Sequence, residues 1–387
     1  MQQSALIDAR ALRRRLLAWH DRHGRKDLPW QRSRDPYHIW VSEIMLQQTQ
    51  VRTVIPYYER FLKRFPDVQT LARAKLDSVL HHWTGLGYYA RARNLKHAAE
   101  TIDNEHGGHF PRHIEAVAAL PGIGRSTAGA ILAFAFDQRH PILDGNVRRV
   151  LTRLHAIETP VLQRDTEQAL WGLAERYTPR TRVADYTQAI MDLGATLCRT
   201  RKPDCPACPL QQDCAAHAQG RPEKFPVRTK RKKLPVREIA MLMIRDARGH
   251  VLLTQRPPVG VWGGLWGFPE CAPDVSAADH CHATLGLQIK TETPWPVRRH
   301  GFSHFQLHIT PIPARLTGAS RLKKASLYKN NHMGKAGLHK TSHVAMECVP
   351  TVWYNPDKPD TRGLAAPVKR LLQQLGKASL HKNSHKK

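Results

Sequence analysis

Four cysteines lie close together near the middle of the chain and could hold an inorganic group. Cys198, Cys205, Cys208 and Cys214 follow the spacing C-x6-C-x2-C-x5-C. Four thiolates this close can bind one compact site, either a zinc ion or an iron–sulfur cubane. Structural zinc usually employs two C-x2-C pairs, and this cluster has one. Because the total of seven cysteines is odd and no apolar signal segment opens the chain, we expect a thiolate metal site in the cytoplasm.

Two acidic residues have neighbours that suit acid and electrostatic catalysis. Glu43 lies in the apolar stretch 37–51, which predicts a helix. A Glu on a solvated helix face is inert, whereas one facing an apolar cleft gains proton affinity and can act as a general acid. Asp144 precedes the predicted helix 147–154, where its ordinary role is an N-cap. An ionised carboxylate there also suits the stabilisation of a cationic sugar. The sequence alone does not decide whether Glu43 is solvated or a general acid, or whether Asp144 is only an N-cap or also a stabiliser of the sugar.

A glycine-containing hairpin joins two predicted helices at residues 120–124. Gly122 and Gly124 allow the backbone to approach a phosphate, and the helix that follows offers free N–H groups. A dinucleotide-binding loop is disfavoured because no strand precedes it and Thr127 stands where a third Gly is needed. Together with Ser126, the segment resembles a helix–hairpin–helix element, which contacts the DNA backbone without reading its sequence.

The elements that must position these side chains form two predicted domains, one helical and one of mixed helices and strands. Residues 1–220 predict an all-α domain, with helical periodicity interrupted by Gly and Pro. The expected helices span residues 11–19, 37–51, 76–80, 126–136, 147–154 and 188–197. A basic, Pro-containing linker follows at 221–236. Residues 237–375 predict an α+β domain, with a hairpin of strands 238–244 and 250–255, further strands 306–311 and 351–354, and a closing helix 367–375.

A nine-residue unit rich in Lys and His occurs three times, at 324–332, 335–343 and 377–385. Two copies fall in an insertion at 322–343 and the third in the tail 376–387. Because each copy has little apolar content, we interpret them as disordered basic segments that attract DNA without specificity. Metal binding through their His residues is the alternative interpretation.

The charge of the chain favours a polyanionic partner. The formal net charge is +28, and removing the nine lysines of the insertion and tail still leaves about +19. Neutralised phosphates release counterions, so such an excess of Lys and Arg favours nucleic acid. No apolar run approaches the length of a membrane span, so we expect no membrane partner.

Taken together, these motifs resemble the MutY family of adenine DNA glycosylases within the endonuclease III-like helix–hairpin–helix superfamily. The matching stretches are 28–30 (LPW), 42–51 (SEIMLQQTQV), 85–89 (GLGYY), the hairpin, 143–147 (LDGNV) and the four cysteines. The resemblance implies a [4Fe–4S] cluster on the cysteines. It also implies that Glu43 protonates adenine, that Asp144 stabilises an oxocarbenium-like sugar and that Asn146 orients this pair. Gln48 and Tyr88 match positions that wedge into the duplex.

The resemblance implies a monofunctional enzyme of base-excision repair. Bifunctional relatives carry a Lys where this chain has Ser126, and a nearby family Lys is here Arg148, a poor imine former. We therefore expect a monomer that hydrolyses the N-glycosidic bond of adenine opposite 8-oxoguanine or guanine in double-stranded DNA. A bifunctional pyrimidine-lesion glycosylase is the principal rival.

The second domain resembles a Nudix fold without its magnesium site. Residues 263–270 (GGLWGFPE) match the entry to that fold, but 279–286 (DHCHATLG) lack the glutamates of an active hydrolase. Phe302, Ser303 and His304 match the family segment that inspects 8-oxoguanine. A nucleotide-pool hydrolase is opposed by the missing glutamates, and a silent lesion-binding protein by the two catalytic carboxylates.

Overall fold

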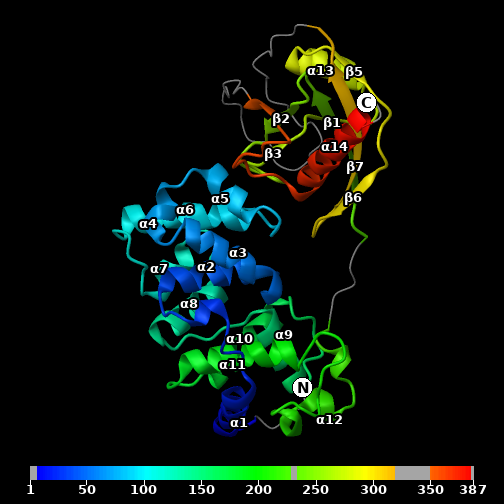
Figure 1. The fold of residues 1–387 in the computed structure, drawn as a ribbon. Helices are drawn as coiled ribbons and strands as arrows, with labels where there is room; N and C mark the ends of the chain where they lie inside the picture. Colours follow the sequence, from blue (N-terminus) through cyan, green and yellow to red (C-terminus); the bar gives the residue numbers. More distant parts are fainter. Residues whose placement is uncertain (1–6, 228–232, 319–348, 385–387) are drawn as a thin grey trace, which may run out of the picture. The chain divides into compact units, whose positions relative to one another are not determined.

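The computed structural model describes residues 7–227, 233–318 and 349–384, with the backbone alone for 377–384. The chain divides into two compact units, of which the described residues are 7–74 and 91–227 in the first and 75–90, 233–318 and 349–384 in the second. The first unit is helical, and the second contains a sheet with helices (Figure 1). The expected order of an all-α domain followed by an α+β domain is therefore confirmed.

The first unit consists of α-helices with short 3-10 turns between them. Its elements are α1 (Ala9–His23), η1 (Pro29–Gln31), α2 (Pro36–Leu46), α3 (Val51–Arg64), α4 (Val68–Arg73), α6 (Ala90–Glu105), α7 (Ile114–Ala119), α8 (Arg125–Phe136), α9 (Gly145–Leu154), α10 (Arg164–Tyr177), α11 (Val183–Thr196), η2 (Gln211–Asp213), α12 (Ala215–Ala218) and η3 (Pro222–Lys224). Helix α2 begins where the sequence predicts, because the Asp35 side chain accepts the Tyr37 amide and Pro36 occupies the first helical position.

The helix expected over residues 37–51 is wrong in its C-terminal part. Helix α2 ends at Leu46, and a turn at Gln47–Gln50 separates it from α3. Gln48 in this turn has a φ of 57°. Gln47, Gln48 and Gln50 in this turn are good helix formers, so tertiary contacts contribute to the break. Helices α3, α4, α6, α7 and α10 were not predicted from periodicity.

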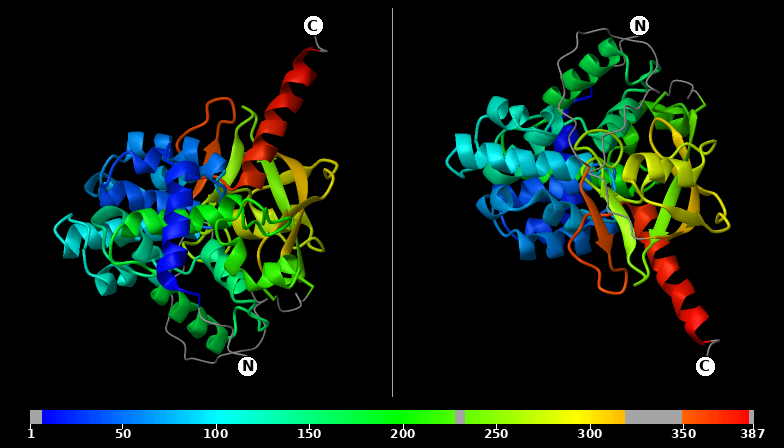
Figure 2. Two further views of the ribbon diagram at one scale, coloured as in Figure 1. Left: turned by 90° about the horizontal axis from the view of Figure 1, so that it is seen from below. Right: turned by 90° about the horizontal axis from the view of Figure 1, so that it is seen from above.

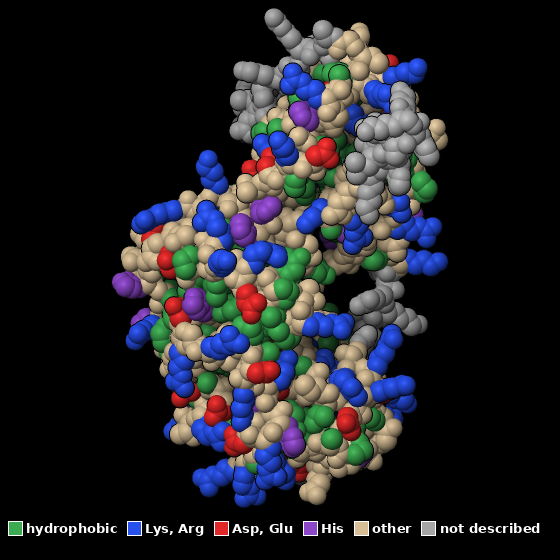
Figure 3. All heavy atoms as spheres, viewed as in Figure 1, with side chains coloured by type: hydrophobic (Ala, Val, Ile, Leu, Met, Phe, Trp, Pro, Cys, Tyr) green, Lys and Arg blue, Asp and Glu red, His purple; other side chains and the backbone are tan. Residues whose placement is uncertain are grey.

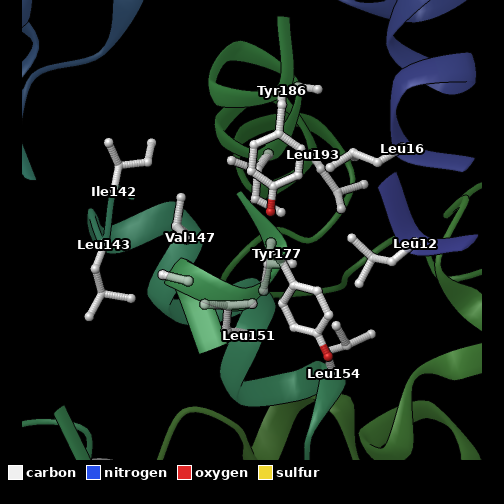
Figure 4. Close-up of a cluster of buried hydrophobic side chains, with 14 of the residues drawn as sticks. Leu12, Leu16, Ile142, Leu143, Val147, Leu151, Leu154, Tyr177, Tyr186 and Leu193 are labelled. Carbon is white, nitrogen blue, oxygen red and sulfur yellow. The ribbon is translucent and has the colours of Figure 1, made fainter. Parts of the chain in front are cut away.

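A core of leucine and aromatic side chains joins α1, α9, α10 and α11. Figure 4 shows Leu12 and Leu16 of α1 among the buried side chains that include Tyr177 and Leu193. Each fully buried leucine stabilises the fold by about 1.5–3 kcal/mol. This core fixes the start of α9, since Leu143 is buried just before that helix.

The second unit contains an eight-stranded sheet with the order β3-β2-β1-β7-β5, in which β4 pairs with β1, β6 with β7 and β8 with β2. Its elements are α5 (Leu76–Trp83), β1 (Val236–Arg245), β2 (Val251–Gln255), β3 (Trp266–Gly267), β4 (Glu270–Cys271), α13 (Ala277–Leu285), β5 (Ile289–Thr291), β6 (Arg298–Gly301), β7 (Gln306–Leu316), β8 (Thr351–Tyr354) and α14 (Ala366–Ser384). Strands β1 and β7 run parallel, and the other pairs are antiparallel. The predicted β1–β2 hairpin is confirmed, with Arg245 opposite Val251.

Residues 75–90 group with this second unit although they precede residue 220. On α5, Asp77 Oδ1 accepts a hydrogen bond from Trp266 Nε1 at 3.2 Å. The Tyr89 hydroxyl donates to the Leu364 carbonyl at 3.1 Å. A Cβ on Gly363 would lie 2.5 Å from the Leu80 Cβ, so only glycine permits this approach without a shift.

The described part of the tail, residues 376–384, is helical, which corrects the expectation of disorder for that part of the third repeat. Helix α14 continues through residues 377–384 (Figure 2). Lys, Ala and Leu in this copy favour helix, and no proline interrupts it. The other two copies, 324–332 and 335–343, lie outside the described residues. In the described part of the chain, no helix has both the length and the apolar character needed to cross a bilayer.

Candidate functional site

The two candidate catalytic carboxylates line one cleft of the helical unit. This cavity has a volume of about 930 Å³, and its walls include Glu43 from α2, Asp144 and Asn146 at the start of α9, and Ser126 from α8. Its size falls within the range that accommodates a small organic group such as a nucleobase. The two carboxylates are 101 positions apart in the sequence, so the fold brings them together.

Glu43 occupies an apolar part of α2. Its neighbours Trp40, Ile44 and Met45 are buried, and Glu43 itself is half-buried. Desolvation raises the pKa of Glu43 to about 8, and the negative charge of Asp144 contributes in the same direction. The carboxyl group therefore keeps its proton near neutral pH and can donate it.

Asp144 caps α9 and faces the cleft with the same carboxylate. Its Oδ1 accepts hydrogen bonds from the Asn146 and Val147 amides at 3.0 and 2.8 Å, and its Oδ2 accepts one from Asn146 Nδ2 at 3.0 Å. Burial raises the pKa of Asp144, while these donors and the charge of Arg149 act in the opposite direction. The N-cap role and the cleft role are thus compatible.

Two residues that sequence reasoning missed surround Asn146. The Arg149 Nη2 donates to Asn146 Oδ1 at 2.9 Å and to the Gly194 carbonyl at 2.5 Å, and its Nε donates to the Cys198 carbonyl at 2.7 Å. A Cβ on Gly194 would lie 2.5 Å from Asn146 Cβ, so α11 approaches α9 closely at this point. The i, i+3 spacing of Asn146 and Arg149 was the available sequence signal for the arginine.

The hairpin residues lie at the start of α8. Gly122 has a φ of 80°, which favours glycine, and Gly124 is the N-cap of the helix. The Ser126 Oγ accepts a hydrogen bond from the Leu143 amide at 3.0 Å, and this residue lines the cleft. Ser126 therefore lines the same space as Glu43.

The two candidate wedge residues both have left-handed backbone conformations. Gln48 is exposed, has a φ of 57° and lines the cleft. Tyr88 has a φ of 49°, and 52% of its surface is exposed, an unusual fraction for a large aromatic side chain. Gln48 belongs to the helical unit and Tyr88 to the second unit.

The four clustered cysteines surround one small cavity. Cys198, Cys205, Cys208 and Cys214 all line it, together with Arg153. The Arg153 Nη1 donates to Cys198 Sγ at 3.2 Å. Burial, with the proximity of the other thiols, raises the pKa of Cys208 to about 12.

The six described cysteines are free thiols. Across those parts of the chain with described side chains, no three His, Cys, Asp or Glu side chains converge closely enough to hold a lone metal ion. The four clustered thiols border one shared cavity. This donor set fits a thiolate-bound group that occupies the space between them.

The predicted lesion-recognition segment forms the connection between β6 and β7. Phe302 stacks on Phe305 at a ring distance of 4.5 Å and contacts Trp262 at 5.4 Å. Ser303 and His304 are exposed, with Ser303 Oγ 3.4 Å from His304 Nδ1. The aromatic ring thus anchors the segment and leaves the two polar side chains accessible.

The Nudix-like unit keeps one glutamate of the entry motif but uses it in an ion pair. Glu270 is hydrogen-bonded to Arg256 Nη1. Desolvation raises the pKa of Glu270, and Arg256 opposes that shift. Helix α13, where an active hydrolase needs further glutamates, has none.

Comparison with known proteins agrees with this geometry. Residues 41–176 match the HhH-GPD superfamily of base excision DNA repair proteins, and residues 240–374 match the NUDIX domain. The chain is 37% identical to the adenine DNA glycosylase of Buchnera aphidicola subsp. Acyrthosiphon pisum (strain APS), over 94% of this chain and 97% of that protein. It is 35% identical to the adenine DNA glycosylase of Homo sapiens, over 78% of this chain and 66% of that protein.

Among solved structures, a thermostable thymine-DNA glycosylase superposes with a TM-score of 0.51 and 28% identity, over 55% of this chain and 97% of that chain. This match reflects the helical unit's fold. The high identity to adenine DNA glycosylases extends over nearly the whole chain, both domains included. The chain therefore belongs to the adenine DNA glycosylases, the HhH-GPD enzymes of base-excision repair.

Proposed function

We propose that this enzyme hydrolyses the N-glycosidic bond of adenine mispaired with 8-oxoguanine or guanine in double-stranded DNA, and that it has no lyase activity. The observation that carries the proposal is a protonated acid and a capped carboxylate in one cleft. Glu43, whose pKa is about 8, and Asp144 both line a cavity large enough to admit a nucleobase.

The reaction needs a proton donor beside the departing base and a negative charge beside the sugar. Adenine leaves readily after protonation, so Glu43 donates its proton to the base as the bond from C1′ to the base nitrogen breaks. The bonding electrons leave with the base, and the sugar becomes cationic. The Asp144 carboxylate stabilises that cation until a water molecule adds to C1′ and gives its proton to the Glu43 carboxylate, which restores the acid. Asn146 holds Asp144 through two hydrogen bonds.

The target base must leave the helical stack before it reaches this cleft. Extrusion costs a few kcal/mol and is easier at a mismatch. Gln48 at the cleft rim and the exposed Tyr88 are proposed to occupy the space beside the lesion. The backbone amides near Gly122 and Gly124 are proposed to bind a phosphate at the start of α8.

The absence of lyase activity is proposed from the side chains at two positions. Ser126 lines the cleft with a hydroxyl group that already accepts the Leu143 amide. Arg148 donates to the Glu167 carboxylate at 2.8 Å and to the Val161 carbonyl at 2.9 Å. Neither residue supplies the free amine that a Schiff base requires.

Recognition of 8-oxoguanine is proposed for the β6–β7 segment. Phe302 is packed against Trp262 and Phe305, while Ser303 and His304 are exposed. A hydroxyl and an imidazole can donate and accept hydrogen bonds with the altered base edge.

We further propose that Cys198, Cys205, Cys208 and Cys214 hold a [4Fe–4S] cluster. When bound, the cluster would cross-link four points of the loop that follows α11. Within that loop, Arg199, Arg201 and Lys202 are available to contact phosphate. On the face drawn in Figure 3, Lys and Arg side chains outnumber Asp and Glu, which suits a monomer that binds the DNA backbone.

The test is single-turnover base release from a duplex with one adenine opposite 8-oxoguanine. The wild type should release adenine and leave the strand intact until alkali is added, and Glu43→Gln should abolish release. Duplexes with a T:A pair or with thymine glycol are the controls. Cleavage of the thymine glycol duplex, or strand scission without alkali, would contradict the proposal.

A further inference from the structure

The turn between α2 and α3 is held by an arginine from another helix. Arg91, the second residue of α6, has 8% of its surface exposed. Its Nη1 donates to the carbonyl oxygens of Ile44, Met45 and Gln47 at 3.0, 2.7 and 2.6 Å. Its Nη2 donates to Thr49 Oγ1 at 3.1 Å. One guanidinium group thus contacts both the end of α2 and the turn beyond it.

These bonds satisfy groups that a helix leaves without partners. The last carbonyl oxygens of an α-helix have no amide of their own helix to accept from. A positive charge at the C-terminus is also favourable with respect to the helix dipole. A lysine could supply the charge, but it lacks the planar fork that reaches the carbonyls and the Thr49 hydroxyl together.

The contacts of Arg91 fall on either side of the residue with unusual backbone geometry. Gln48 has a φ of 57°, a conformation that is uncommon for residues other than glycine. Such a conformation persists where surrounding contacts impose it. Arg91 bonds to the Gln47 carbonyl before it and to the Thr49 hydroxyl after it. The residues of the turn, Gln47–Gln50, line the cleft, whereas Arg91 does not.

We infer that Arg91 is a positioning residue, which fixes the turn so that Gln48 can engage the duplex, and that it does not touch the substrate. The inference rests on the wedge role proposed above for Gln48. Tyr88 lies three positions before Arg91 in the sequence. The start of α6 therefore follows Tyr88 closely in the chain, and its Arg91 side chain bonds to the residues on either side of Gln48.

The test compares Arg91→Lys with Arg13→Lys, using two DNA substrates. Arg13 is a matched control because its guanidinium also donates to backbone carbonyls, at Tyr177, Arg176 and Thr178, and it is not part of the cleft. One substrate has adenine paired opposite 8-oxoguanine in a full duplex. In the other, the adenine lies within a short bubble and is already unstacked.

Arg91→Lys should slow base release from the full duplex by about tenfold or more, because small misplacements of a positioning group have large effects on rate. Release from the bubble should stay within about twofold of wild type, since no wedge is needed there. Arg13→Lys should match wild type on both substrates. If Arg91→Lys fails to fold, Thr49→Val removes the Arg91–Thr49 bond, together with the bond from Thr49 to the Gln47 carbonyl, and should show the same selective loss, smaller in size.

Three results distinguish the possible failures. Equal rates for Arg91→Lys and Arg13→Lys on the full duplex would overturn the inference while leaving the proposed function intact. Equal losses of Arg91→Lys on the duplex and the bubble would also overturn it, because they would indicate damage to the chemical step. If the wild type releases adenine from neither substrate, the proposed function is refuted, and so is the inference about Arg91 that rests on it.

Discussion

Arg149 donates from Nη2 to Asn146 Oδ1 at 2.9 Å, and Asn146 Nδ2 in turn donates to Asp144 Oδ2 at 3.0 Å. The carboxamide of Asn146 is therefore fixed at both ends. The same guanidinium donates from Nε to the Cys198 carbonyl at 2.7 Å. The carboxylate in the cleft and the first cysteine of the cluster are thus joined through two side chains.

Arg149→Ala should slow base release from the lesion duplex by about tenfold to a hundredfold, with a much smaller change in DNA binding. Without the guanidinium, Asn146 can rotate and Asp144 loses its orientation for the developing cation. Single-turnover rates and binding titrations measure the two effects separately. Arg148→Ala, at the adjacent position but outside the cleft, serves as the control. An unchanged rate for Arg149→Ala would contradict this role.

The rate of base release should fall as the pH rises through about 8. The pKa of Glu43 is raised to about 8, so the carboxyl group is protonated below that value and loses its donor proton above it. Well above the pKa, the rate constant should decrease about tenfold for each pH unit. A single-turnover pH profile from about 6 to 10 measures this decrease, because that range spans the pH at which Glu43 titrates. A rate that is constant from pH 7 to 9 would exclude Glu43 as the acid.

Glu43→Gln should stabilise the protein at alkaline pH. A carboxyl group with a pKa near 4.5 when unfolded and about 8 when folded contributes its full stability below pH 4.5 and loses it as the pH rises through 8. Above that pH the buried charge destabilises the fold, and a neutral amide avoids this cost. Because the cleft admits water that screens the charge, we expect a gain of about 1–3 kcal/mol at pH 9.

Urea unfolding of wild type and Glu43→Gln at pH 5 and pH 9 checks that expectation. The two proteins should differ little at the lower pH. Glu115→Gln, on the exposed side of α7, should change the free energy of unfolding at neither pH. A wild type that is as stable as Glu43→Gln at pH 9 would show that the carboxylate is well solvated.

Gly194→Ala should reduce both stability and activity. The added methyl group would lie 2.5 Å from Asn146 Cβ and 3.0 Å from the Asn146 backbone, so the start of α9 must shift. We expect a loss of about 1–3 kcal/mol in the free energy of unfolding and slower base release. Thermal unfolding and single-turnover rates measure these changes.

Gly172→Ala is the matched control for that substitution. Gly172 lies in α10, and a Cβ there would have no neighbour within 4 Å. Replacing glycine by alanine inside a helix should then stabilise by about 0.5–1 kcal/mol. Destabilisation by both substitutions would indicate a general intolerance of helix changes instead of a specific contact with Asn146.

Substitution of Ser303 and His304 by alanine should reduce the preference for 8-oxoguanine over guanine opposite adenine. These exposed side chains are proposed to bond to the altered base, and loss of each such bond should cost about 1–3 kcal/mol of discrimination. The measurement is the ratio of base-release rates from A:8-oxoguanine and A:G duplexes. Thr291→Ala, exposed on β5, is the control. An unchanged ratio for the double variant would show that Ser303 and His304 do not contribute to recognition of 8-oxoguanine.

The sequence by itself determined the class of each domain and the residues that could carry the chemistry. Helical periodicity before residue 220 and the β-rich hairpin after the linker arise from local patterns, and the structure has both. The spacing of the four cysteines is also a local property, because residues within one short loop must lie near one another. The resemblance of these motifs to adenine DNA glycosylases is likewise read from the chain alone.

The tertiary structure decided what each residue faces. Whether Glu43 meets solvent or a cleft depends on α8 and α9, which lie far away in the sequence. The break after Leu46 depends on Arg91, a residue 45 positions later, and local propensity favoured a continuous helix. The roles of Arg149 and Gly194 depend on the approach of α11 to α9. Long-range packing fixes these contacts, and local sequence patterns therefore do not predict them.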